Sequence, residues 1–375
     1  MRIAYDVRPL IKKETGVGVY LKNLLENLAE IDKENEYYLF SGSVKDRFPE
    51  EKIPEFSKYK LVDVRISVNA LNYLWNNLSF PKIDLFFKEK IDVCHSPTPL
   101  IIPTKGKKVI TVHDLFFLEK PEWCEREIKR DYAKKIKKSI KISDGIITPS
   151  YFTKKDVLER FEILEKKIRV IHHGVNKIFT EFIPDEEINS VKSKYNLPKN
   201  FILFVGNLEK RKNIINLLKA FSLVCRKIND LSLLLIGDGR AHKKEIIYEV
   251  NKLKINEKVS LIGYVKQDEL PSFYKLCLAF VFPSLWEGFG LPLLEAIASG
   301  VPVAASKTTS IPEVAENSAL YFDSNDIEDM AEKLEKILTD IDLRRELIKQ
   351  GKDTVKKFSW KRAAEETLSF YQEIL

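Results

Sequence analysis

Cysteine is scarce in this chain of 375 residues, and its four copies are scattered along the sequence. They form no Cys-x-x-Cys pair, and most lie in apolar or helical surroundings, where free thiols pack as small hydrophobic groups. No apolar run approaches the ~18 residues that a membrane span requires. We therefore expect no disulfides and a reducing, cytoplasmic location, which includes the inner face of the membrane.

Three motifs that would indicate a cofactor or a metal are incomplete or misplaced. Gly16-Val-Gly18 precedes an amphipathic helical pattern, but Leu21 occupies the third glycine position of a dinucleotide fingerprint. This departure disfavours a nicotinamide-dependent oxidoreductase. The pair His172-His173 has no third ligand nearby at a recognisable spacing, and Asp340-Ile-Asp342 lies far from any predicted strand end. The sequence therefore predicts no metal site.

Composition and length describe an ordinary globular protein with more than one domain. Hydrophobic residues make up 44% of the chain and charged residues 31%, and 375 residues are too many for one comfortable core. The net charge of +7 is modest. The lysines do not alternate with aromatic residues as they would in a single-stranded nucleic acid site, so we expect no nucleic acid partner.

Strands and helices alternate in both halves of the chain. The first half opens with an apolar strand pattern at Ile3–Val7, and the second half opens in the same way at Phe201–Val205. After each opening strand, a glycine loop leads into an amphipathic helical pattern. The polar segment 176–199, interrupted by prolines, contains the connection between the halves. This repetition predicts an α/β protein with two domains.

The most informative stretch is Pro283–Pro302. An apolar strand pattern precedes it, and Glu287-Gly288-Phe289-Gly290 forms a loop before a short helix whose first turn suits Pro292. The two glycines let a ligand lie against the backbone, and the start of the helix favours an anion. Glu287 at the lip of the loop and Glu295 inside the helix place two carboxylates near such a ligand. Taken singly, Glu287 is better explained as a solvated turn residue and Glu295 as a favourable first-turn charge, but the spacing of the pair favours a ligand site.

Basic and polar side chains follow two other strand patterns. Arg211 and Lys212 lie between the strand that ends at Val205 and the next helix, where a guanidinium fork and an ammonium group can hold a diphosphate. Adjacent bases are also common on surfaces. His113-Asp114 stands at the carboxyl end of an apolar strand pattern, which is where parallel sheets bind ligands. A lone histidine is more often a packed or surface residue.

With these motifs in this order, the chain resembles the retaining nucleotide-sugar glycosyltransferases of the GT-B fold, the glycosyl transferases group 1. The family signature is Glu, seven residues, Glu around such a glycine loop, as at Glu287 and Glu295. The resemblance implies two Rossmann-like, doubly wound domains facing a cleft. It implies an acceptor domain over residues 1–178, a donor domain over 179–357, and a C-terminal helix, 358–375, that returns to the first domain.

The resemblance also implies roles for individual residues, grouped by the part of the donor that they meet. The two glycines of the first loop are equally well explained as a flexible helix start. The implied residues are, for catalysis, His113 and Glu287; for the diphosphate, Arg211, Lys212, Gly206, Gly16, Gly18 and Leu291; for the sugar, Gly288, Phe289, Gly290 and Asp114; and for the nucleoside, Glu295, Tyr264 and Val265.

The activity that follows is transfer of a hexose from a nucleoside diphosphate sugar to a hydroxyl of a saccharide or lipid-linked acceptor, without a cofactor or a metal. GDP-mannose and UDP-hexose both stay open as donors, and the likeness to bacterial polysaccharide mannosyltransferases favours mannose. A nucleotide-sugar epimerase on the same fold is the alternative. The strongly basic helical pattern Arg126–Lys141 is usually a solvated face, but because many relatives act on lipid-linked acceptors it is also a candidate for peripheral membrane contact.

Overall fold

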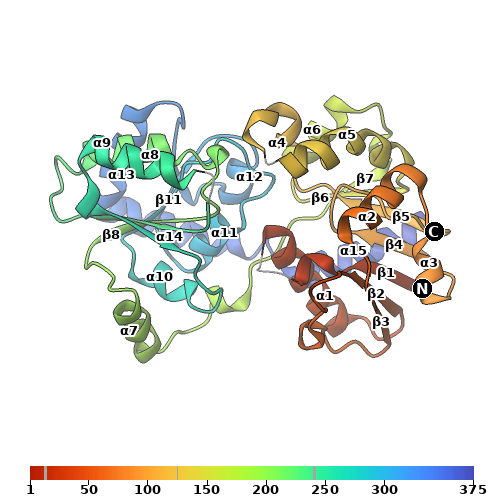
Figure 1. Ribbon diagram of the computed structural model, residues 1–375. Coiled ribbons are helices and arrows are strands. Elements are labelled where there is room, and N and C mark those ends of the chain that lie inside the picture. The colour runs from red at the N-terminus through yellow and green to blue at the C-terminus, as the bar shows by residue number, and fades with distance from the viewer. Residues whose placement is uncertain (12–14, 125, 240–241) are drawn as a thin grey trace. The chain divides into compact units, whose positions relative to one another are not determined.

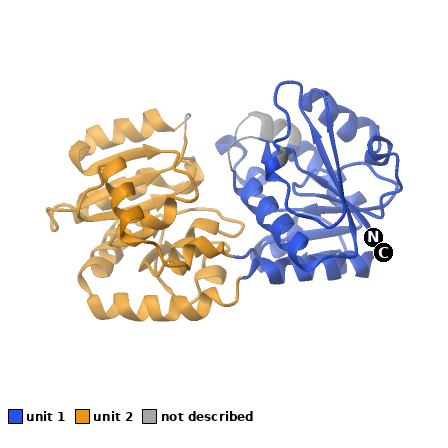
Figure 2. Ribbon diagram, turned by 90° about the horizontal axis from the view of Figure 1, so that it is seen from below, with its two compact units in different colours: residues 1–174, 359–375 blue, residues 175–358 orange. Residues whose placement is uncertain are grey.

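The chain forms two compact units in the computed structural model, which describes residues 1–11, 15–124, 126–239 and 242–375. Unit 1 consists of residues 1–174 together with 359–375, and unit 2 consists of residues 175–358 (Figure 2). Unit 1 is therefore discontinuous in sequence, because its last segment follows the whole of unit 2.

Unit 1 is built on a parallel sheet that has seven strands among the described residues. The order β3-β2-β1-β4-β5-β6-β7 reverses direction between β1 and β4, as in a doubly wound sheet. The strands are β1 (Arg2–Asp6), β2 (Glu36–Gly42), β3 (Tyr59–Val64), β4 (Val93–Ser96), β5 (Lys107–Thr111), β6 (Gly145–Thr148) and β7 (Ile168–Val170).

Helices connect these strands, and one more arrives from the far end of the chain (Figure 1). The expected helix after the first strand begins at Gly16, where the Thr15 hydroxyl accepts a hydrogen bond from the Gly18 N–H. The helices of unit 1 are α1 (Gly16–Ile31), α2 (Val68–Tyr73), α3 (Ile83–Phe87), α4 (Phe116–Glu119), α5 (Arg126–Ile142), α6 (Tyr151–Arg160) and α15 (Trp360–Ile374).

Helix α15 packs against α1 and is joined to the sheet by buried polar groups. The Tyr371 hydroxyl lies 2.5 Å from His95 Nδ1 on β4 and 2.5 Å from the Tyr5 hydroxyl on β1. The other ring nitrogen of His95 lies 2.7 Å from Thr111 Oγ1 on β5. Burial lowers the pKa of His95 to about 3, so this imidazole is neutral at pH 7. The network fixes α15 against three central strands.

Unit 2 repeats the doubly wound plan with a parallel sheet of six strands among the described residues, in the order β10-β9-β8-β11-β12-β13. The strands are β8 (Phe201–Val205), β9 (Ser232–Ile236), β10 (Val259–Gly263), β11 (Ala279–Phe282), β12 (Val303–Ser306) and β13 (Ala319–Phe322). The helices are α7 (Asp185–Lys194), α8 (Ile214–Val224), α9 (Lys243–Leu253), α10 (Leu270–Leu276), α11 (Leu291–Ala298), α12 (Ile311–Ala315), α13 (Ile327–Thr339) and α14 (Ile341–Val355).

Both faces of the unit 2 sheet are buried, because side chains along a strand alternate between them. On β8, Phe201 and Leu203 pack with residues of α10 and α11, whereas Ile202 and Phe204 pack with residues of α8, α9 and α13. Figure 1 shows these two helical layers on opposite sides of the sheet. The continuous apolar run Phe201–Val205 is thus explained by a strand covered on both faces.

Candidate active site

The predicted donor residues of unit 2 gather where the strand order reverses. Strands β8 and β11 are parallel neighbours, with Ala279 aligned to Ile202. The loops that follow them, residues 206–213 and 283–290, therefore leave the sheet at the same carboxyl edge, which is the usual ligand position in open α/β sheets. Leu285 N–H donates to Arg211 O at 2.8 Å, so the two loops are in direct contact.

Three charged side chains of these loops form one ion cluster. The Lys212 ammonium contacts Glu287 Oε1, and Arg211 Nη1 lies 3.0 Å from Glu287 Oε2. Lys212 is 5% exposed and Glu287 is 6% exposed, so this pair is buried at the sheet edge. Burial alone would raise the pKa of Glu287, but Lys212 and Arg211 hold it below its usual value. Glu287 is therefore an ionised carboxylate held by two cations.

Arg211 has further partners that fix its guanidinium group. Its Nε donates to Glu209 Oε2 at 2.9 Å, and its Nη1 also donates to the Trp286 carbonyl at 3.2 Å. These bonds orient the Arg211 guanidinium group between the two loops. Sequence reasoning missed Glu209, although its position two residues before an arginine in a strand-to-helix loop was a usable signal.

Glycines shape the backbone on both sides of the cluster. Gly206 has φ +151°, and a Cβ there would lie 3.3 Å from the Phe204 ring and 3.7 Å from Lys212 Cε. Gly290 has φ +103° and stands directly before α11, whose first turn contains Pro292 as the sequence predicts. Leu291 is the first residue of that helix. The loop therefore brings the start of α11 to the edge that carries the ion cluster.

The loop after β12 is hydrogen-bonded to the backbone of the glycine loop. Thr309 Oγ1 accepts a hydrogen bond from Glu287 N–H at 3.2 Å, and the Ser310 hydroxyl donates to Glu287 O at 2.9 Å. The Ser310 hydroxyl also lies 3.2 Å from Phe289 O. Sequence reasoning assigned no role to this polar segment, residues 306–310, and its hydroxyl groups hold Glu287 in position.

Glu295, the second predicted glutamate, lies within α11 and is buried. The Tyr274 hydroxyl, from α10, lies 3.3 Å from Glu295 Oε2. Burial raises the pKa of Glu295 to about 7, and the bond from Tyr274 acts in the opposite direction. Glu295 therefore changes charge near neutral pH, unlike Glu287.

Two predicted site residues have side chains in the core, so only their backbone is available to a ligand. Phe289 is buried and its ring packs edge-on against Phe358 at 5.7 Å. Val265 is buried in the cluster that includes α10 and α11. Gly288 is buried within the loop, and Tyr264, which follows β10, is 45% exposed.

The remaining predicted residues belong to unit 1. His113 follows β5, and its Nε2 lies 3.0 Å from the Pro97 carbonyl oxygen. Burial lowers the pKa of His113 to about 4, so its ring is neutral at pH 7. Asp114 accepts a hydrogen bond from the Phe116 N–H at 3.3 Å. Gly16 and Gly18 form the first turn of α1.

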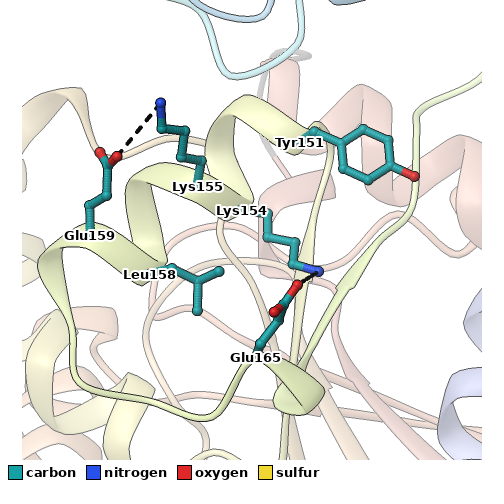
Figure 3. Close-up of a pocket in the computed structure, with 6 residues that line it drawn as sticks. All are labelled: Tyr151, Lys154, Lys155, Leu158, Glu159 and Glu165. Atoms are coloured by element: carbon teal, nitrogen blue, oxygen red, sulfur yellow. Dashed lines mark ion pairs between the residues drawn. The ribbon is translucent and has the colours of Figure 1, made fainter.

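A pocket of unit 1 lies along α6 (Figure 3). Its lining includes the ion pairs Lys154–Glu165 at 2.7 Å and Lys155–Glu159 at 3.7 Å. None of the predicted site residues lines it. In the part of the chain that the structure describes, no group of three potential metal ligands is found, and no helix is long and apolar enough to cross a membrane.

Comparison with known proteins agrees with this geometry. The family profile described as "Glycosyl transferases group 1" matches residues 185–354, and that described as "Glycosyltransferase Family 4" matches residues 15–177. Together these profiles cover most of both units. The chain belongs to the group 1 glycosyltransferases. The resemblance stated from its motifs is thus confirmed, and the protein is a glycosyltransferase enzyme.

The relatives of this glycosyltransferase include O-antigen chain mannosyltransferase B of Escherichia coli, which is 26% identical over 99% of this chain and 100% of the relative. Among solved structures, sucrose-phosphate synthase from Thermosynechococcus elongatus has a TM-score of 0.76 at 21% identity, covering 100% of this chain and 98% of that one. Anabaena HepE, solved with UDP and glucose, has a TM-score of 0.75 at 14% identity, covering all of both chains. The predicted GT-B fold is confirmed.

Proposed function

We propose that this glycosyltransferase moves a hexose, with mannose as the first candidate, from a nucleoside diphosphate sugar to a hydroxyl of a saccharide or lipid-linked acceptor. The name of the Escherichia coli relative, an O-antigen chain mannosyltransferase, supports mannose and a polysaccharide product. The nucleotide in the HepE structure, UDP, supports a nucleoside diphosphate donor. Guanosine and uridine both stay open as the nucleoside.

The observation that carries the proposal is the ion cluster at the β8 and β11 edge. Arg211 and Lys212 provide a fork of N–H donors and a point charge, the two groups best suited to a diphosphate. Glu287 and Glu209 already hold these cations in place before a donor arrives. Because the cations are positioned in advance, they can stabilise the charge that develops on the leaving diphosphate without a large reorganisation.

In the proposed reaction the bond between the anomeric carbon and the β-phosphate oxygen breaks, and its electron pair stays on the diphosphate. The acceptor hydroxyl attacks the same face of the sugar, and its proton passes to the departing phosphate oxygen. Retention of configuration follows without a covalent intermediate. The contacts of Glu287 support this route, because a carboxylate held by two cations is a weak nucleophile.

Other residues bind the rest of the donor in this proposal. Glu295 accepts hydrogen bonds from the ribose hydroxyls, and the backbone at Tyr264 and Val265 meets the base. The backbone of the glycine loop meets the sugar. In unit 1, the neutral ring of His113 acts as a hydrogen-bonding partner for the transferred sugar. No metal is required, because Arg211, Lys212 and the start of α11 supply the positive charge.

A donor panel tests the proposal. Calorimetry with GDP-mannose, UDP-glucose, NADH and single-stranded DNA is expected to give heat only with a nucleotide sugar, and turnover with a saccharide acceptor is expected to persist in EDTA. Proton NMR of the product will then report the anomeric configuration. An inverted product would rule out the retaining route, and release of an altered sugar without acceptor would indicate an epimerase. Absence of binding to every nucleotide sugar would refute the donor site.

A further inference from the structure

A turn of unit 1, residues 73–80, exposes three large apolar side chains. Tyr73 and Leu78 are each 63% exposed, and Phe80 is 58% exposed. Single apolar residues on a surface are normal, but three within one short turn form a patch. Their shared location points to contact with a partner that removes them from water.

The 73–80 turn is a defined structure and not a loose loop. Its Trp75 ring is buried, packs against Phe40 at 5.3 Å, and donates its indole N–H to Pro81 O at 2.9 Å. Residues Leu74–Leu78 form a single π-helical turn directly after α2. The buried indole holds the turn that displays Tyr73, Leu78 and Phe80.

A basic helix adjoins this turn. The Lys138 ammonium of α5 donates to Asn76 O, within the turn, at 3.1 Å. Lys134 and Lys141 lie one helical turn before and after Lys138, so they belong to the same stripe of α5, and both are exposed. The apolar patch thus borders a row of lysines.

The turn and the part of α5 that follows Asp131 contain no carboxylate. Residues 132–142 of α5 include five lysines and no aspartate or glutamate, and residues 64–83 also lack both acids. Cations beside protruding apolar side chains fit a surface that presents anionic head groups over hydrocarbon. An acidic protein would also meet the lysines, but it would leave unexplained three large apolar side chains that are 58–63% exposed on one short turn, whereas insertion between lipids removes them from water.

We propose that the 73–80 turn and the lysine stripe of α5 form a docking surface for an anionic lipid bilayer. The lysines attract the head groups, and Leu78 and Phe80 enter the boundary of the acyl chains. This surface extends the sequence hypothesis for the basic helix, because the apolar turn supplies the insertion that lysines alone lack. The proposal does not depend on the identity of the donor, and it is tested without turnover.

The test is sedimentation of the full chain with phosphatidylcholine vesicles that contain or lack phosphatidylglycerol, at low and high salt. We expect binding only to the anionic vesicles, weakened by salt. L78S/F80S should bind at least about tenfold more weakly, since each side chain loses its apolar burial. K134Q/K141Q should bind roughly 30-fold more weakly, because each lysine near such a surface contributes ~1 kcal/mol to the free energy of binding.

The matched control is F182S/I341S, which removes two exposed apolar side chains from unit 2, where Phe182 is 87% exposed and Ile341 is 59% exposed. This variant should bind as the wild type does, and thermal unfolding should show that all three variants are folded. Wild-type binding by L78S/F80S, equal binding to neutral vesicles, or no binding at all would overturn the proposal. So would self-association without lipid that L78S/F80S abolishes, because the turn would then be a protein interface.

Discussion

Replacement of Lys212 by methionine separates the charge of this side chain from its volume. Methionine fills a similar space but cannot contact Glu287 or a diphosphate. Loss of one preorganised electrostatic group typically lowers kcat by about 100-fold to 1,000-fold, and we expect K212M to fall in this range with a raised KM for the donor. Calorimetry with the free nucleoside diphosphate should show weakened binding, since the lost contact is to the leaving group.

The same substitution also has a calculable effect on stability. Removing one partner of a buried ion pair costs about 3–5 kcal/mol when the other charge is left unpaired. Here Arg211 still lies 3.0 Å from Glu287, so the expected loss in the free energy of unfolding is smaller than ~3 kcal/mol. Kinetics measured well below the unfolding midpoint will therefore report on the site and not on the folded fraction.

Lys210 provides a matched control, because it lies in the same short 3-10 helix, Lys210–Lys212, and is exposed. K210M should keep kcat and KM within about twofold of the wild type, as expected for a solvated surface charge. If K212M had wild-type kcat/KM, or if K210M lost as much activity as K212M, the ion cluster would not be the diphosphate site.

Three further predictions concern pH and packing. Burial raises the pKa of Glu295 to about 7, so donor KM should rise as pH falls through 7 and the carboxylate becomes protonated. The raised pKa also means that protonated Glu295 stabilises the fold below pH 4.5, and that this stabilisation is lost as pH rises through 7. Urea unfolding across this pH window will detect the change. Y371F should lower the free energy of unfolding by about 1–3 kcal/mol, since it leaves Nδ1 of the buried His95 without a partner while Thr111 still meets Nε2, and an unchanged urea midpoint would contradict the network. G237A should lower the thermal midpoint, because φ is +142° and the added Cβ would lie 1.9 Å from Gly206 O, whereas G16A, with nothing within 4 Å, should not.

Much of the fold was predictable because the strands of these sheets are buried on both faces. The run Phe201–Val205 is a strand as expected, the apolar run before Pro283 forms the strand Ala279–Phe282, and the helix after the glycine loop begins at Leu291, one residue before Pro292. Continuous apolar segments, prolines and glycines are local signals, so they survive in the sequence without knowledge of the partners.

The contacts within the site were not predictable in the same way. Sequence alone placed Lys212 and Glu287 in separate loops, and their pairing depends on β8 and β11 being neighbours in the sheet. The opposite charge behaviour of Glu287 and Glu295 also depends on tertiary surroundings, since one carboxylate meets two cations and the other meets a tyrosine. The hydroxyl groups of Thr309 and Ser310 act through the same three-dimensional arrangement.

The discontinuity of unit 1 has a consequence for synthesis on the ribosome. Residues 359–375 are translated after all of unit 2, yet Tyr371 supplies the hydroxyl that meets both Tyr5 and His95. Until α15 is made, the nascent N-terminal sheet keeps these polar groups uncovered. Unit 2 can therefore finish folding before unit 1, whose N-terminal strands gain their contacts with α15 only after residues 175–358 have been translated.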